Sequence, residues 1–132
     1  MAYQVLIVDD DSAIRELLRE FLAEEGLTTR EAASKAEAYE VMEDTDPDLM
    51  LLDMWLPDGD GLDVLDSLRG RSEIPVIVIT ADSSSSRTIR AMQAGAFDYL
   101  VKPLEPEAVR AAVRRALEQR RMARDLLATV LP

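Results

Sequence analysis

Short apolar runs alternate with helical patterns five times along the chain. The predicted strands are residues 5–8, 27–32, 49–52, 76–79 and 97–101. The first, third and fourth runs are continuously apolar, which is typical of parallel strands that are buried on both faces. The second run is weaker, because charged and hydroxyl side chains interrupt it.

Between these runs, apolar residues recur at spacings of three and four, which indicates amphipathic helices. Gly26 and Gly95 stand where the first and fourth helices would end. Ser34, with Glu37 three residues later, predicts a capping box at the start of a second helix that runs to about residue 44. The serines at 83–86 open the fourth helix, and a long final helix begins near residue 105. The helical apolar positions are Ile14, Leu17, Leu18, Phe21 and Leu22, then Leu62, Leu65 and Leu68, then Ile89 and Met92.

Strands that alternate with helices predict βαβ units and a parallel sheet covered on both faces. Five such units fit an α/β, doubly wound, flavodoxin-like (βα)5 fold with strand order 2-1-3-4-5. The length of 132 residues suits one such domain with a single core.

Charge and composition narrow the classes of function. The formal net charge is −11, and residues 105–132 carry six arginines against four acids, so the preceding 104 residues carry −13. An acidic body argues against direct nucleic-acid binding by this domain. The chain has no cysteine and no histidine, which excludes disulfides, thiolate catalysis and most zinc sites. We expect no signal peptide and no membrane span, and we expect the domain to be cytoplasmic.

Polar residues follow four predicted strands at the points where they end. In doubly wound sheets, ligands bind at this edge. Carboxylates gathered there repel one another unless a cation neutralises them, and oxygen-only ligands favour Mg²⁺ or Mn²⁺. A hydroxyl and an ammonium beside them suit the oxygens of a phosphoryl group, and a carboxylate is its nucleophile. These residues are Asp9, Asp10 and Asp11, then Asp53, Thr80 and Lys102.

Each of these residues also has an ordinary structural explanation. Carboxylates after a strand commonly cap helices, and Asp11 or Ser12 is the expected cap of the first helix. For Asp9 or Asp10 alone, capping explains the residue as well as metal binding does. Only the placement of the whole set at four strand ends favours a phosphoryl-transfer site.

Four segments resemble those of one known family. Residues 5–11 (VLIVDDD) resemble the start of a response-regulator receiver domain, and residues 51–61 (LLDMWLPDGDG) resemble its phosphorylation segment. Residues 77–81 (IVITA) and 95–103 (GAFDYLVKP) resemble its two switch segments. The motifs keep the family's order and spacing, so the chain is identified as a member of the two-component receiver family, similar to chemotaxis regulators.

The resemblance implies a phosphoacceptor and a metal site. Asp53 would accept a phosphoryl group from the phosphohistidine of a sensor kinase or a phosphotransfer protein. Mg²⁺, or Mn²⁺ in its place, would be held by Asp9, Asp10, Asp53 and the backbone carbonyl of Trp55. The aspartyl phosphate would then hydrolyse slowly. Such a domain catalyses its own phosphorylation and dephosphorylation without being a conventional enzyme.

The resemblance also implies a switch. Thr80 and Lys102 would contact phosphoryl oxygens, and the bond from Lys102 to Pro103 would be cis, which aims the ammonium into the site. Thr80 would move toward the phosphoryl group and the ring of Tyr99 would turn inward. This would remodel the face formed by the fourth helix, fifth strand and fifth helix, through which such domains commonly dimerise.

Two further side chains flank the expected route of attacking water. Trp55 follows the phosphoacceptor by two residues, and Asp82 follows Thr80 by two. We hypothesise that both tune the lifetime of the phosphorylated state. The alternative for Trp55 is an exposed apolar patch that binds a partner.

Other classes of protein fit less well. A haloacid-dehalogenase-type phosphatase needs an aspartate where Trp55 stands, and a flavodoxin needs a hydroxyl- and glycine-rich loop where residues 9–11 are acidic. A calcium loop at residues 58–61 fails, because Leu62 and Asp63 occupy positions that need a ligand and a glycine. A degenerate receiver that only binds a partner remains the non-enzymatic alternative.

The final helix is longer than a receiver domain requires. We expect a receiver domain over residues 1–121 and a helical extension or linker stub over residues 122–132. The segment at 95–103 is similar to transcriptional regulators with an ATPase output, which favours a linker; a long last helix in a stand-alone regulator is the alternative. The stripe that suggests a continuing helix is Val109, Val113 and Ala116, then Ala123, Leu127 and Val130, with Arg120 as an interruption.

Overall fold

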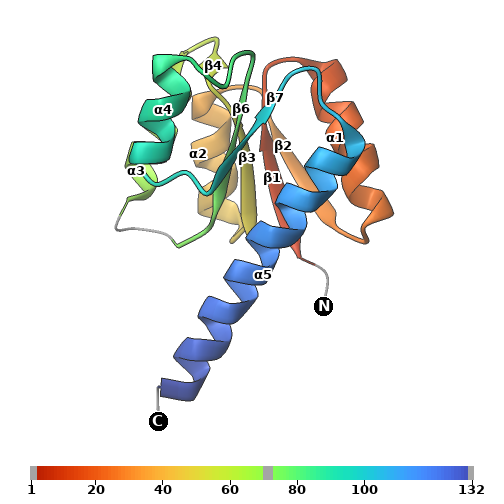
Figure 1. The fold of residues 1–132 in the computed structure, drawn as a ribbon, viewed down its shortest axis with the longest axis vertical. Coiled ribbons are helices and arrows are strands. Elements are labelled where there is room, and N and C mark those ends of the chain that lie inside the picture. Colours follow the sequence, from red (N-terminus) through yellow and green to blue (C-terminus); the bar gives the residue numbers. More distant parts are fainter. Residues whose placement is uncertain (1–2, 70–72, 131–132) are drawn as a thin grey trace.

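Five parallel strands form one sheet in the part of the chain that the structure describes. The computed structural model describes residues 3–69 and 73–130. The spatial order β2-β1-β3-β6-β7 is the predicted order 2-1-3-4-5, so the doubly wound, flavodoxin-like fold is confirmed (Figure 1). The strands are β1 (Gln4–Val8), β2 (Thr28–Ala32), β3 (Leu49–Asp53), β6 (Val76–Thr80) and β7 (Asp98–Val101).

Helices cover both faces of this sheet (Figure 1). Successive strand side chains point to opposite faces, so each strand contributes to two cores. In β1, Val5 and Ile7 pack with α1 and α5, whereas Leu6 and Val8 pack on the side of α2, α3 and α4. The helices are α1 (Ser12–Glu24), α2 (Lys35–Asp44), α3 (Gly61–Leu68), α4 (Ser86–Gln93) and α5 (Pro106–Val130).

The structure contains the two predicted helix caps, one of them only in part. Asp11 caps α1 by accepting a hydrogen bond from the amide of Ala13 at 2.9 Å. Ser34 caps α2 and accepts from the amide of Glu37 at 3.1 Å. The return half of the predicted capping box differs, because the Glu37 carboxylate accepts from the amide of Ala33 at 3.3 Å.

The turn-rich segment after β3 forms a small antiparallel ribbon, which the sequence pattern did not predict. Its strands are β4 (Trp55–Leu56) and β5 (Gly59–Asp60). Between them, the Asp58 carboxylate accepts from the amides of Lys35 and Ala36 at 2.8 and 3.0 Å. These bonds lower the pKa of Asp58 and attach the start of α2 to the segment that follows the site.

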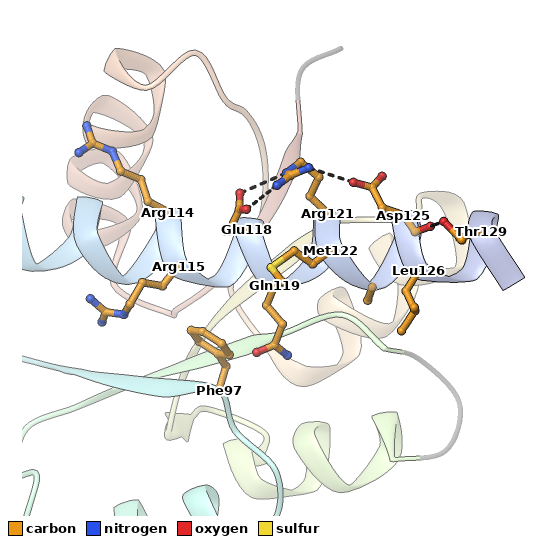
Figure 2. A pocket seen from close by; sticks show the side chains of 11 residues that line it. Phe97, Arg114, Arg115, Glu118, Gln119, Arg121, Met122, Asp125, Leu126 and Thr129 are labelled. Atoms are coloured by element: carbon orange, nitrogen blue, oxygen red, sulfur yellow. Dashed lines mark hydrogen bonds and ion pairs between the residues drawn. The ribbon is translucent and has the colours of Figure 1, made fainter.

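Helix α5 continues without a break beyond the sheet (Figure 1). Arg124, on this outer part, forms a 2.7 Å ion pair with the largely buried Asp48, just before β3. A groove beside this outer part of α5 is lined by Phe97, Met122 and Leu126 among others (Figure 2). The side chain of Val130 and residues 131–132 lie outside the described part of the chain. No helix among the described residues is long and apolar enough to cross a membrane.

Candidate functional site

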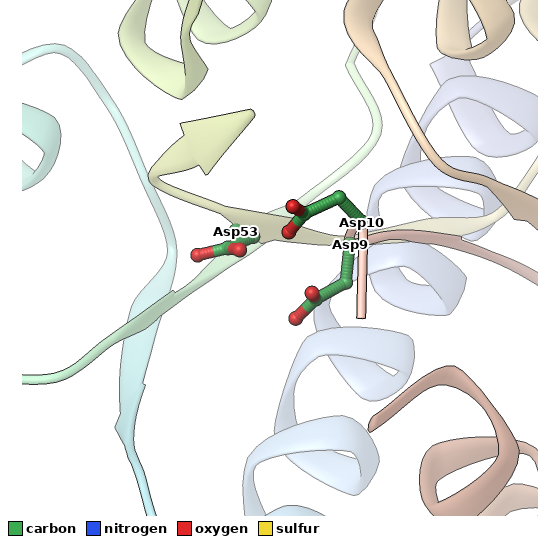
Figure 3. A group of neighbouring side chains, drawn as sticks. All are labelled: Asp9, Asp10 and Asp53. Carbon is green, nitrogen blue, oxygen red and sulfur yellow. The ribbon is translucent and has the colours of Figure 1, made fainter. Parts of the chain in front are cut away.

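Three carboxylates meet at the carboxyl edge of the sheet. Asp9 directly follows β1, Asp10 comes next, and Asp53 is the last residue of β3. One oxygen of each lies within 4.8 Å of the others (Figure 3). Asp9 is fully buried and Asp53 is 6% exposed, whereas Asp10 is exposed to solvent. The apolar runs of β1 and β3 therefore end directly before Asp9 and Asp53, the residues whose carboxylates could take part in chemistry.

Lys102 provides the positive charge at this cluster. Its Nζ lies 3.4 Å from Oδ2 of Asp9 and 3.7 Å from Oδ2 of Asp53. The Lys102–Pro103 bond is cis, as predicted. The backbone amide of Lys102 donates to the carbonyl of Thr80 at 2.8 Å, which joins the ends of β6 and β7. This ammonium thus lies near two of the three carboxylates, and the negative charge of the cluster is only partly neutralised.

The donor set fits a hard divalent cation. All three side chains offer carboxylate oxygens, the ligands that such ions prefer. Oδ1 of Asp9 accepts from the amide of Asp11 at 2.9 Å, but its buried Oδ2 accepts no hydrogen bond from the described residues. This oxygen lies 3.4 Å from the Lys102 ammonium, which is shared with Asp53, so a divalent cation would neutralise the negative charge that remains in the cluster.

Burial and neighbouring charge perturb Asp53. Desolvation, followed by the negative charge of Asp9, raises the pKa of Asp53 from 3.8 to about 6, and Lys102 opposes this rise. The amide of Trp55 also lowers this pKa by donating to Oδ1 of Asp53 at 3.4 Å. The carboxylate is therefore a stronger base than an ordinary aspartate, which is a property of a nucleophile.

The hydroxyl of Thr80 lies at the same edge but is bonded away from Asp53. It donates to the carbonyl of Asp82 and accepts from the Asp82 amide, both at 3.2 Å. The buried hydroxyl of Thr88, on α4, donates to it at 3.0 Å. Thr88 also lies 3.0 Å from the Asp82 carbonyl, so Thr80 is attached to the first turn of α4.

Tyr99 lies one strand away from Thr80 on the same side of the sheet. Tyr99 pairs with Val78 in the register of β6 and β7, and Thr80 is two residues after Val78. Residues two apart on a strand share a face, and Val78 faces the core beside α4. Tyr99 is 39% exposed, so its ring is partly in solvent.

The ribbon after β3 forms another wall of the site. The amide of Gly61 donates to the carbonyl of Met54 at 2.8 Å, and a Cβ at Gly61 would lie 2.5 Å from the carbonyl oxygen of Asp53. Only glycine allows α3 to begin so close to the end of β3. Trp55 is 63% exposed, and the guanidinium of Arg87 from α4 lies over its ring.

The structure brings together Asp9, Asp10, Asp53 and Lys102, as predicted, and places Thr80 at the same edge. The sequence analysis missed Thr88 and Arg87, which connect α4 to the two loops beside the site. Nothing in the spacing of these residues along the helix indicated their contacts, because both contacts depend on how α4 packs against the sheet.

The comparisons with known proteins agree with this geometry. The family model for the response regulator receiver domain matches residues 5–114. The chain is 36% identical over 119 residues to the transcriptional regulatory protein SrrA of Staphylococcus aureus, which covers 90% of this chain and 49% of that protein. It therefore spans about half the length of the curated relatives it matches.

Solved structures show the same likeness. The crystal structure of NtrX from Brucella abortus superposes with a TM-score of 0.90 at 32% identity, covering 98% of this chain and 30% of that one. The isolated receiver domain of NtrX gives a TM-score of 0.81 at 34% identity, covering 86% of this chain and 98% of that one. With its family model, its relatives and its acidic edge in agreement, the chain belongs to the response regulator receiver domains of two-component signalling.

Proposed function

We propose that Asp53 accepts a phosphoryl group from the phosphohistidine of a sensor histidine kinase or phosphotransfer protein. The observation that carries this proposal is the buried Asp53 carboxylate, held between two further carboxylates and the ammonium of Lys102. A carboxylate oxygen of Asp53 attacks phosphorus, the bond from phosphorus to the histidine nitrogen breaks, and an aspartyl phosphate forms. Such phosphoryl transfer depends mainly on positioning and charge neutralisation.

The same residues would hold Mg²⁺, or Mn²⁺ in its place. Asp9, Asp10 and Asp53 supply the oxygens, with the backbone carbonyl of Trp55 as the proposed fourth ligand. The ion would supply positive charge to the oxygens of the phosphoryl group during transfer. The gathering of three carboxylates around the shared Lys102 ammonium supports this assignment.

Lys102 and Thr80 bind the remaining phosphoryl oxygens in this proposal. The Lys102 ammonium is already within 3.7 Å of Asp53. Thr80 must first exchange its bond to the Asp82 carbonyl for one to the phosphoryl group. Movement of the Thr80 hydroxyl toward the phosphoryl group would also break the hydrogen bond that it accepts from Thr88, so the chemistry at Asp53 would be transmitted to α4.

The output surface would be the face formed by α4, β7 and α5. Tyr99 shares the side of the sheet that α4 covers, and its ring would turn inward once Thr80 has moved. This face exposes four large apolar side chains, which suits a surface that binds a partner or a second copy of the chain. They are Ile89, Met92, Tyr99 and Val101.

The whole protein would be a transcriptional regulator. SrrA is named as one, and this chain covers about half of it. We propose that residues 1–121 act as the receiver and that residues 122–132 lead toward an output domain, with an ATPase output as one form. Phosphotransfer from a sensor kinase would place the domain in the cytoplasm.

Intact-mass spectrometry tests this proposal. The protein is incubated with acetyl phosphate in the presence and absence of Mg²⁺, beside Asp53→Asn. Asp66→Asn is the matched control, because Asp66 is an exposed aspartate of α3 outside the acidic cluster. We expect a single phosphoryl adduct that requires Mg²⁺, forms on the control and is lost in Asp53→Asn.

An adduct that persists in Asp53→Asn would place the phosphoacceptor elsewhere. A folded protein that binds Mg²⁺ but takes no phosphoryl group from acetyl phosphate or from a phosphorylated kinase would be a degenerate receiver. Its function would then be phosphorylation-independent protein binding, which no observation favours at present.

A further inference from the structure

Arg87, the second residue of α4, is held by two groups of the ribbon after β3. The carbon at the centre of its guanidinium lies 3.7 Å from the centroid of the Trp55 ring. Its Nη2 forms an ion pair with Asp60. Its Nε is buried and donates to none of the described residues, which is unfavourable. The contacts with Asp60 and Trp55 therefore hold the Arg87 side chain in place although burial of its Nε is unfavourable.

The anchor for Arg87 is rigid. Asp60 is the N-cap of α3, and its Oδ1 accepts from the amide of Leu62 at 2.9 Å. This bond leaves Oδ2 for Arg87. Because one carboxylate both starts a helix and pairs with Arg87, the guanidinium has a fixed position relative to the phosphoacceptor strand.

Trp55 is the side chain that this guanidinium restrains. Its indole is 63% exposed, so the protein core does not fix its orientation. Its backbone amide donates to Asp53 at 3.4 Å, which places the residue at the rim of the site. A guanidinium over an aromatic face is an attractive contact and covers that face from solvent.

We propose that Arg87 is a positioning residue: it holds the Trp55 indole at the rim of the Asp53 site and thereby slows the access of water to the aspartyl phosphate. This inference rests on the proposed function of Asp53. In the hydrolysis concerned, a water oxygen attacks phosphorus, the bond between phosphorus and the Asp53 oxygen breaks, and inorganic phosphate leaves. Asp53 returns as a carboxylate, and the proton released goes to solvent.

The first experiment measures the indole directly. Trp55 is the only tryptophan of the chain, so tryptophan emission reports on this side chain alone. Arg87→Met removes the guanidinium but keeps most of the aliphatic stem. Arg90→Met is the matched control, because Arg90 is an exposed arginine of the same helix. We expect stronger quenching by acrylamide in Arg87→Met, no change in Arg90→Met and a partial return in Arg87→Lys.

The second experiment measures the lifetime of the phosphorylated protein by intact mass after removal of the phosphodonor. We expect Arg87→Met to shorten the lifetime by roughly two- to fivefold, the effect of one cation–π contact. Trp55→Ala should shorten it similarly, and the double variant should show no further change, since Arg87 acts through the indole.

Each outcome decides the matter. Independent, multiplying effects of the two substitutions, or an unchanged lifetime in Arg87→Met, would refute the role of Arg87 while leaving phosphorylation of Asp53 intact. Unchanged quenching in Arg87→Met would show that the guanidinium does not restrain the indole. Absence of an adduct in every variant, wild type included, would refute the proposed function itself, and the inference with it.

Discussion

Replacing Asp53 by asparagine should stabilise the fold in the absence of a divalent cation. The Asp53 side chain is 8% exposed and lies beside the buried Asp9. Its pKa is raised because folding makes the charged form less favourable, mainly through desolvation and then through the charge of Asp9. Asparagine has nearly the same shape and carries no charge, so the variant avoids this cost.

The magnitude follows from the pKa. The rise from 3.8 to about 6 corresponds to about 3 kcal/mol at 1.36 kcal/mol per unit. Because the folded protein binds the Asp53 proton more tightly than the unfolded chain does, stability falls as the pH rises between these two values. The cost of the charge is complete above about pH 6 and absent near and below pH 4. The free energy of unfolding of Asp53→Asn should therefore exceed that of wild type by roughly 1–3 kcal/mol above this pH interval and by almost nothing below it.

Urea denaturation without metal, above and below this pH interval, measures the difference in free energy of unfolding between Asp53→Asn and wild type. Above the interval, added Mg²⁺ should reduce this difference, because an ion bound only by the folded wild type stabilises that protein. Asp58→Asn is the control of opposite sign. Amides of Lys35 and Ala36 lower the pKa of Asp58, so the variant should be less stable than wild type at neutral pH, and this loss should vanish as the pH falls.

Two results would refute this reasoning. One is an Asp53→Asn variant that is no more stable than wild type above the interval in the absence of metal. The other is a stability difference that stays constant across the interval. The first result would mean that Lys102 compensates the charge of Asp53 in full, in contrast to the raised pKa. The second would mean that the difference in stability does not come from ionisation of Asp53.

Three further substitutions test the surroundings of the site. Gly61→Ala should lower the free energy of unfolding, measured with urea, by roughly 2 kcal/mol or more, because a Cβ would lie 2.5 Å from the Asp53 carbonyl oxygen; full stability would contradict the close approach. Arg124→Ala should lower the free energy of unfolding by about 1 kcal/mol and speed amide hydrogen exchange in the last turns of α5, because Asp48 loses its ion pair. Thr88→Val should lower the free energy of unfolding by about 1 kcal/mol and Thr88→Ser by much less, because the Thr88 hydroxyl donates a hydrogen bond to Thr80; equal thermal midpoints for the two variants would contradict this.

Most of the fold was predictable from local pattern. Continuous apolar runs such as 49–52 identified buried parallel strands, and helical spacing together with caps such as Asp11 identified the helices between them. These signals are local, because a strand or a helix repeats over a few neighbouring residues. The half-formed capping box at Ser34 and the ribbon β4–β5 differed from expectation, because their bonds depend on backbone geometry that residue type does not determine.

The acidic site was also predictable, although its members lie far apart in the sequence. Asp9 and Asp53 each stand where a strand ends, and the ends of adjacent parallel strands meet at one edge of the sheet. Placing the strands therefore placed the carboxylates, and Lys102 followed from the same rule. The bonds of Thr80 did not follow, because a hydroxyl has several partners within reach.

The sequence by itself determined which residues could carry the chemistry, and only the tertiary structure decided what holds them. Four contacts join separate elements: the bonds of Asp58 with the first amides of α2, the contact of Arg87 with Trp55, the bond of Thr88 to Thr80 and the ion pair of Arg124 with Asp48. Such contacts depend on the angle and rotation at which a helix packs on the sheet, and that geometry is set by the whole core rather than by any local repeat.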